Sequence, residues 1–117
     1  MASVTETISP MSGGEPLTFV KVAPVKDLNP GEMKPVEAGG KEILLVNLNG
    51  QFLAIGNRCT HMNCMLSDGK LEGENIRCWC HGSVFNIKTG NVVTGPARKP
   101  EPAFQVKVEG EQVSVNV

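Results

Sequence analysis

The sequence has 117 residues, a formal net charge of −1 and 40% hydrophobic residues, which is enough for one domain with a modest core. The near-zero charge argues against a nucleic-acid-binding protein, and the longest aliphatic run, Ile43-Leu44-Leu45-Val46, is far shorter than the about 20 residues that span a membrane. With no secretory signal at its start, the chain is expected to be soluble, cytoplasmic and monomeric, without a membrane anchor.

The expected elements are strands joined by turns. Residues 1–16 are rich in Ser, Thr, Gly and Pro, which predicts a flexible N-terminal tail. A strand is predicted over residues 17–25, and an edge strand over 32–37, because Pro35 has no backbone N–H to donate and so does not fit a central strand. The clearest hairpin spans residues 42–56, with Asn49-Gly50 as a type I′ turn. A second hairpin is predicted over 104–117, around Glu109-Gly110.

The segment between the two hairpins has a different composition, with many turns and few long hydrophobic patterns. Residues 57–95 are interrupted by Gly-containing turns, and short strands fit only at 75–77, 84–87 and 91–93. No helix longer than two turns is predicted. The fold class is therefore all-β, an antiparallel β framework of sandwich-like or barrel-like form with a loop-rich subdomain inserted. A single domain over residues 17–117 is expected, with a base framework at 17–56 and 96–117 and the inserted subdomain at 57–95.

All four cysteines and both histidines lie between residues 59 and 81. Cys59 and His61 form one pair of close ligands, and Cys78 and His81 form another; a short turn directs two side chains to one point. Cys64 and Cys80 remain, one in each loop. A loop-rich segment buries little apolar surface, so a metal or covalent staple is expected here.

Four hypotheses fit these residue types: a 2Fe–2S centre held by two thiolates and two imidazoles, a tetrahedral zinc site, a dithiol redox enzyme, and merely structural side chains. Clustering of all six residues argues against the last. Zinc fingers usually pair Cys with Cys and His with His, and zinc leaves two cysteines idle. A redox dithiol is usually Cys-x-x-Cys in a βαβ unit, which is not predicted here. Mixed ligation places the potential at about −150 to +300 mV, against about −400 mV for all-cysteine clusters.

The segments Cys59-Thr60-His61-Met62-Asn63-Cys64 and Cys78-Trp79-Cys80-His81-Gly82-Ser83 resemble the two cluster-binding loops of Rieske iron–sulfur proteins. The additional cysteine in each loop resembles the high-potential branch, which includes soluble archaeal proteins of the sulredoxin type. The resemblance implies a Rieske-type 2Fe–2S cluster, a Cys64–Cys80 disulfide, an inner iron bound by Cys59 and Cys78, and an outer iron bound by His61 and His81.

Residues around these loops also match or depart from the high-potential pattern. Gly95-Pro96-Ala97 resembles the proline loop that covers the cluster, and Ser83 remains as a hydroxyl donor. Trp79 replaces a proline and Phe85 replaces a tyrosine. Because a phenol that donates to a cysteine sulfur stabilises the reduced cluster, Phe85 is expected to lower the potential. Met62 and Trp79 are predicted to form an apolar docking collar.

These features predict a one-electron carrier of high potential with transient protein donors and acceptors, and no catalytic residues of its own. One alternative is the ferredoxin component of a multicomponent oxygenase, which usually lacks the two extra cysteines. Another is a zinc-stapled interaction module. Because intracellular disulfides are typical of hyperthermophiles, the Cys64–Cys80 pair also hints at a thermophile source.

The reduction potential is predicted to be flat at low pH and to fall at alkaline pH. The iron's charge acidifies the remaining N–H of each ligand imidazole, and reduction weakens this effect. The fall is expected to be at most about 59 mV per pH unit for each proton coupled to one electron. Voltammetry over a pH series measures it, and a potential that stays flat to about pH 10 would argue against exposed histidine ligands.

Overall fold

The computed structural model of the chain describes residues 18–60, 63–80 and 82–117, so the predicted tail at 1–16 lies outside the described residues. Within these ranges the chain forms strands and two short 3-10 helices, and all strand pairs are antiparallel. The strands are β1 (Phe19–Pro24), β2 (Met33–Ala38), β3 (Lys41–Leu48), β4 (Gln51–Gly56), β5 (Lys70–Glu72), β6 (Asn75–Arg77), β7 (Val84–Asn86), β8 (Val92–Thr94), β9 (Ala103–Phe104), β10 (Val106–Glu109) and β11 (Gln112–Asn116). The 3-10 helices are η2 (Val25–Asp27) and η3 (Leu66–Asp68). The all-β expectation is confirmed.

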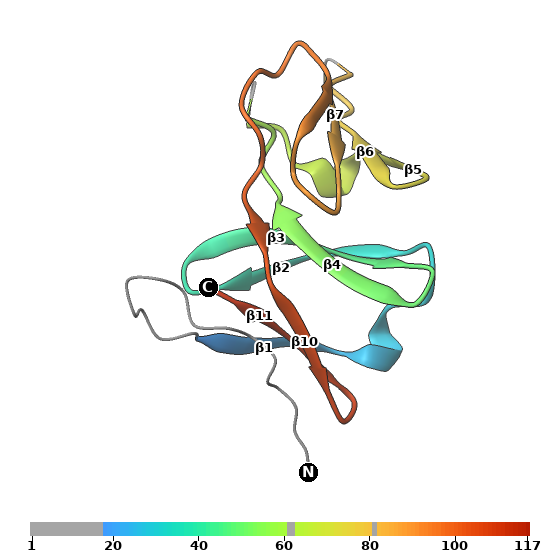
Figure 1. Cartoon of the computed structure of the whole chain (residues 1–117), viewed down its shortest axis with the longest axis vertical. Coiled ribbons are helices and arrows are strands. Elements are labelled where there is room, and N and C mark those ends of the chain that lie inside the picture. The colour runs from blue at the N-terminus through green and yellow to red at the C-terminus, as the bar shows by residue number, and fades with distance from the viewer. Residues whose placement is uncertain (1–17, 61–62, 81) are drawn as a thin grey trace.

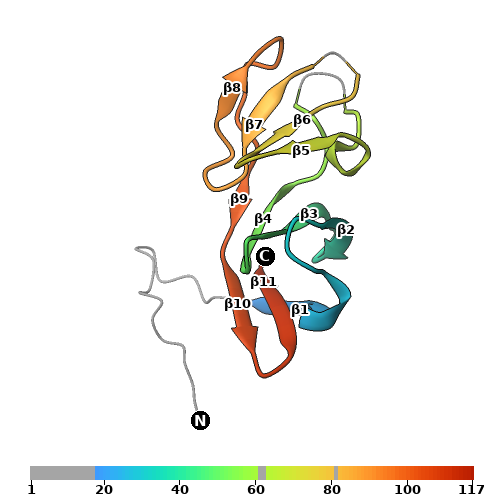
Figure 2. The same cartoon turned by 90° about the vertical axis from the view of Figure 1, so that its right-hand side faces the viewer.

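The strands form three sheets, with orders β1-β11-β10, β2-β3-β4-β9 and β5-β6-β7-β8. The β5–β8 sheet lies at one end of the long axis, the β1-β11-β10 sheet lies at the other, and β2, β3 and β4 lie between them (Figure 1). In the rotated view, β9 runs from the β5–β8 end toward β10 (Figure 2). The chain therefore leaves the β2–β4 layer after β4 and returns to it at β9, which pairs with β4.

Both predicted hairpins are confirmed. β3 and β4 pair from Ile43↔Gly56 to Leu48↔Gln51, and Asn49 and Gly50 have φ of 55° and 96°, as a type I′ turn requires. β10 and β11 form the C-terminal hairpin, but its first strand starts at Val106, because Phe104 lies in β9 and pairs with Ala54 of β4. Pro35 lies in β2, which among the described strands pairs only with β3, so the predicted edge position is also correct.

Strand β3 connects two hydrophobic cores. Successive side chains of a strand point to opposite faces, so Ile43 and Leu45 pack in one core with Val113 and Val115, whereas Leu44 and Val46 pack in the other. The second core also contains Leu66, Ile76, Phe85, Ile87 and the two buried cysteines Cys59 and Cys78. The aliphatic run of β3 thus links the core around the cysteines to the core around β11.

Two short strands were not predicted. β5 and β9 are three and two residues long, and their pairing with β6 and β4 depends on neighbours in the fold rather than on a local hydrophobic pattern. Strands β5–β8 all lie within residues 57–95, but the boundaries of a base framework and an inserted subdomain stay a prediction. No helix among the described residues has the length and apolar character to cross a membrane.

Candidate metal centre

Two loops with the same backbone hydrogen bonds carry the predicted cysteine ligands. In the first loop, Cys59 N–H donates to the Cys64 carbonyl (2.7 Å) and Asn63 N–H donates to the Cys59 carbonyl (2.8 Å). In the second loop, the equivalent bonds are Cys78 N–H to the Ser83 carbonyl (2.7 Å) and Gly82 N–H to the Cys78 carbonyl (3.1 Å). Cys59 and Cys78 therefore occupy equivalent positions.

The fifth position of each loop has a left-handed backbone. Asn63 has φ of 62° and Gly82 has φ of 81°. Glycine adopts this conformation without a steric cost, and asparagine is among the few other residues that tolerate it. The local sequence thus permits the same sharp reversal in both loops.

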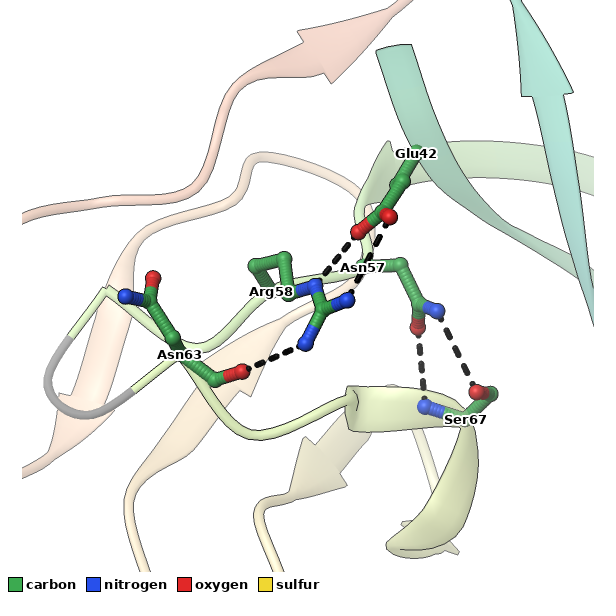
Figure 3. Close-up of polar contacts among 5 residues, drawn as sticks. All are labelled: Glu42, Asn57, Arg58, Asn63 and Ser67. Carbon is green, nitrogen blue, oxygen red and sulfur yellow. Dashed lines mark hydrogen bonds and ion pairs between the residues drawn. The ribbon is translucent and has the colours of Figure 1, made fainter.

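An arginine precedes the cysteine in each loop and braces it in the same way. Arg58 pairs with Glu42 through Nε and Nη2, and its Nη1 donates to the Asn63 carbonyl at 3.0 Å (Figure 3). These hydrogen bonds lower the pKa of Glu42 below its usual value. Both side chains of this pair are substantially exposed, so the pair adds little to stability. Its main effect is to hold Arg58 in position to bind the Asn63 carbonyl.

Arg77 repeats this arrangement in the second loop. Its Nε and Nη2 lie 3.1 and 3.2 Å from the two carboxylate oxygens of Glu72, and its Nη1 lies 3.3 Å from the Gly82 carbonyl. The hydrogen bonds from Arg77 lower the pKa of Glu72. The repeated Arg-Cys dipeptide is a sequence signal for this equivalence that we did not use in the sequence analysis.

The side chain of Asn57 attaches the first loop to η3. Its Oδ1 accepts a hydrogen bond from Ser67 N–H at 2.8 Å, and its Nδ2 donates to Ser67 Oγ at 3.2 Å (Figure 3). Asn57 is buried, so these bonds satisfy an amide that would otherwise be costly to bury. The loop is therefore braced on both of its sides.

The four cysteines divide into two pairs. Cys64 and Cys80 form a disulfide that joins the two loops. Cys59 and Cys78 lie outside the disulfide and are each only 1% exposed. The Sγ atoms of Cys64, Cys78 and Cys80 lie within 4.8 Å of one another, so the disulfide decides which of these thiols is available to a metal.

Three predicted site residues, His61, Met62 and His81, lie outside the described residues. The described part of the site fits an iron–sulfur cluster in its donor chemistry. It offers two buried thiols at equivalent positions of paired loops, and thiolates are the donors that hold iron in such clusters.

The segment predicted to cover the site lies against the second loop. Ala97 N–H donates to Ser83 Oγ at 3.0 Å, and Ser83 is fully buried. With its oxygen accepting this bond, the Ser83 hydroxyl retains its own proton for donation. Phe85 is also fully buried, in the core that contains Cys59 and Cys78. Trp79, by contrast, is 61% exposed.

One residue near the site was missed by the sequence analysis. Glu101 is 4% exposed, and its carboxyl group accepts a hydrogen bond from the backbone N–H of Thr60, between Cys59 and His61. Burial raises the pKa of Glu101 and the Thr60 hydrogen bond partly offsets this, so that the pKa lies at about 7. Because the two residues are far apart in sequence, no local pattern indicated the contact.

Comparison with known proteins supplies the family evidence. The family model described as Rieske [2Fe-2S] domain matches residues 18–115. The chain is 37% identical over 101 residues to the ferredoxin component of biphenyl 2,3-dioxygenase from Rhodococcus jostii (strain RHA1), covering 86% of this chain and 94% of that one.

Two further similarities concern a longer protein and a solved structure. Apoptosis-inducing factor 3 of Mus musculus is 43% identical over 94 residues, which are 80% of this chain, but the match spans only 16% of that relative. A solved complex of reduced oxygenase and oxidised ferredoxin in carbazole 1,9a-dioxygenase contains a chain that superposes with a TM-score of 0.79 at 33% identity, covering 84% of this chain and 92% of that chain.

Proposed function

Because the chain belongs to the Rieske 2Fe–2S family, we infer that it is an electron carrier and not a catalyst of substrate oxidation. A Rieske-type cluster supplies reversible one-electron chemistry, and the protein supplies ligands, burial and hydrogen bonds. The observation that carries this function is the equivalence of Cys59 and Cys78, two buried thiols in loops with matching hydrogen bonds.

We propose the complete ligand set from the sequence. Cys59 and Cys78 hold one iron, and His61 and His81 hold the other, a mixed ligation that raises the potential above that of all-cysteine clusters. Ser83 is proposed to donate its hydroxyl proton toward the sulfur atoms, which favours the reduced state. The buried position of Ser83 and its acceptor role toward Ala97 support this proposal.

Phe85, Gly95 and Pro96 are proposed to enclose the centre. Phe85 packs in the same core as both cysteines without a hydroxyl group, so it contributes apolar surroundings and no hydrogen bond. Replacement of a donor by an apolar ring favours the more weakly charged oxidised state. The two extra cysteines therefore predict a high reduction potential, and Phe85 is expected to lower that potential.

The proposed acceptor is the oxygenase of a multicomponent system. A ferredoxin component of a dioxygenase and a ferredoxin in complex with its oxygenase are among the similar proteins, and both support transient electron transfer between protein partners. A potential near −150 mV, at the low end of the Rieske range, would favour this acceptor, and a clearly positive potential would favour a high-potential carrier.

Trp79 is the proposed contact with that partner. Its indole is 61% exposed in the loop that also carries Cys78, and exposed aromatic side chains are frequent anchors of interfaces. Trp79→Ala is expected to weaken the complex with the oxygenase about tenfold without changing the reduction potential, as measured by calorimetry and voltammetry. Unchanged affinity would contradict the proposal.

The experiment that tests the function is iron and acid-labile sulfide analysis combined with an EPR spectrum of the dithionite-reduced protein. Iron and sulfide in equal amounts and the spectrum of a mixed-ligand 2Fe–2S centre are expected. A colourless protein that contains zinc and no sulfide would instead establish the zinc-stapled alternative. Cytoplasmic location, monomeric state, absence of nucleic-acid binding and a thermophile source stay predictions.

A further inference from the structure

Glu101 is a buried carboxyl group that has no role in the electron-carrier function proposed above. It is 4% exposed, its backbone N–H donates to the Gly90 carbonyl at 2.8 Å, and its Oε2 has no hydrogen-bond partner among the described residues. A Cβ atom at Gly56 would lie 2.5 Å from Glu101 Oε1, so the carboxyl group lies directly against the backbone of Gly56 and would have to shift if a larger residue stood there. Burying a carboxyl group with so few hydrogen-bond partners lowers the stability of the fold. A functional role of Glu101 would account for this cost.

The segment that contains Glu101 holds the first ligand loop at two points. The Thr60 backbone N–H donates to the Glu101 carboxyl group, and Thr60 Oγ1 donates to the Lys99 carbonyl at 2.7 Å. Thr60 lies between Cys59 and His61, the two proposed ligands of that loop. Thr60 therefore links the Glu101 segment directly to both proposed ligands of this loop.

We propose that Glu101 both positions Thr60 in the first ligand loop and accepts a proton from water when the protein takes up one electron. This inference rests on the proposed function. The electron comes from the protein donor, the proton comes from water and converts the carboxylate into a carboxylic acid, and reoxidation reverses both steps. Glu101 thus acts as a positioning and charge-compensating residue.

A route for the proton is present. Glu101 is among the residues that line a cavity of about 500 Å³ that also contacts the first ligand loop at Arg58, Thr60 and Asn63. The charged side chains along this cavity are Glu37 of β2, Lys41 and Glu42 of β3, Arg58 and Glu101 itself.

None of these charged groups pairs with Glu101 among the described residues. Arg58 pairs with Glu42, and Lys41 Nζ lies 5.7 Å from the centre of the Phe104 ring. β4 and β9 add no charge to the cavity lining, and Lys88, in the turn that contacts Glu101 through Gly90, pairs with Glu74 at 3.3 Å. The proton affinity of Glu101 is therefore governed by burial, by the Thr60 hydrogen bond and by the charge of the ligand site next to Thr60.

The direction of the pH effect follows from the charges. Burial raises the pKa of Glu101 to about 7, so it ionises near neutral pH, well below the alkaline range predicted for ligand imidazoles. Reduction adds a negative charge, which raises the pKa of Glu101 further. The oxidised protein thus loses this proton at lower pH than the reduced protein, and the potential falls as pH rises through this interval.

The test compares wild type, Glu101→Gln and Glu37→Gln by voltammetry of the cluster-loaded proteins between about pH 5.5 and about pH 8.5. The side-chain amide introduced by Glu101→Gln retains an acceptor for Thr60 N–H but has no charge. Glu37 is an exposed carboxylate on the same cavity and serves as the matched control. A proton affinity about threefold higher in the reduced protein corresponds to about 28 mV at 59 mV per tenfold change.

We expect wild type and Glu37→Gln to show this fall near neutral pH and Glu101→Gln to lack it. A purely structural role of Glu101 would shift the Glu101→Gln potential by the same amount at every pH. Parallel curves, or a wild-type potential that is flat across this range, would overturn the proposal.

A second measurement needs no variant to fold. The redox difference infrared spectrum of wild type near pH 7 should gain the C=O band of a protonated carboxylic acid on reduction, and Glu101→Gln, where it folds, should lack that band. Absence of the band in wild type would also overturn the proposal. If the proposed electron-carrier function itself were wrong, the result would be different: neither wild type nor any variant would show a reversible one-electron wave.

Discussion

Replacement of Cys78 by serine is expected to lower the iron and acid-labile sulfide content of the purified protein at least tenfold. Cys78 is 1% exposed, lies outside the disulfide and occupies the position equivalent to Cys59. A serine hydroxyl stays protonated near neutral pH and is a poor substitute for a thiolate ligand. Loss of residues that merely orient metal ligands already costs about 10- to 100-fold in affinity, so loss of a ligand should cost more.

Cys64→Ser/Cys80→Ser is the matched control. The Sγ atoms of Cys64, Cys78 and Cys80 lie within 4.8 Å of one another, so distance alone does not identify the thiols that bind iron. The double variant removes only the two sulfur atoms of the disulfide and should retain both the cluster and its EPR spectrum. A full cluster in Cys78→Ser together with an empty double variant would reverse the assignment of ligands and brace.

The sequence was sufficient to predict those structural elements that depend on the chemistry of neighbouring residues. Asn49-Gly50 predicted its turn because both residues tolerate positive φ, and Pro35 predicted an edge strand because it lacks an N–H. The ligand window was visible because all cysteines and histidines are concentrated there. In each case the determining residues are adjacent or nearly so.

Features that depend on contacts between distant segments were not predictable in this way. The run Ile43-Leu44-Leu45-Val46 indicated a strand, but only the fold shows that its two faces enter different cores. The bond between Thr60 and Glu101 joins segments about forty residues apart, and Glu101 resembles any surface carboxylate in the sequence. Such contacts are set by how the segment after β8 returns to the base, which no local pattern specifies.

Removal of the disulfide, in Cys64→Ala/Cys80→Ala, is expected to lower the free energy of unfolding by about 3 kcal/mol, since the bond closes a loop with a sequence separation of 16 residues. The decrease in stability should affect mainly the two ligand loops, because each loop contributes one half-buried cysteine to the disulfide. Urea titration followed by bleaching of the cluster and by circular dichroism measures it, with an expected decrease of about 1–3 M in the midpoint.

A phosphine reductant provides the control for this prediction. It should lower the midpoint of wild type toward that of the double variant and leave the variant unchanged, because only wild type has a disulfide to reduce. The entropic account predicts that bleaching and loss of circular dichroism move together if the loops unfold with the base. If bleaching alone moves, the disulfide stabilises the loops locally and the base unfolds independently. Equal midpoints for variant and wild type in both signals would mean that the disulfide adds no stability, and that other contacts, among them the bonds from Arg58 and Arg77, suffice to hold the loops.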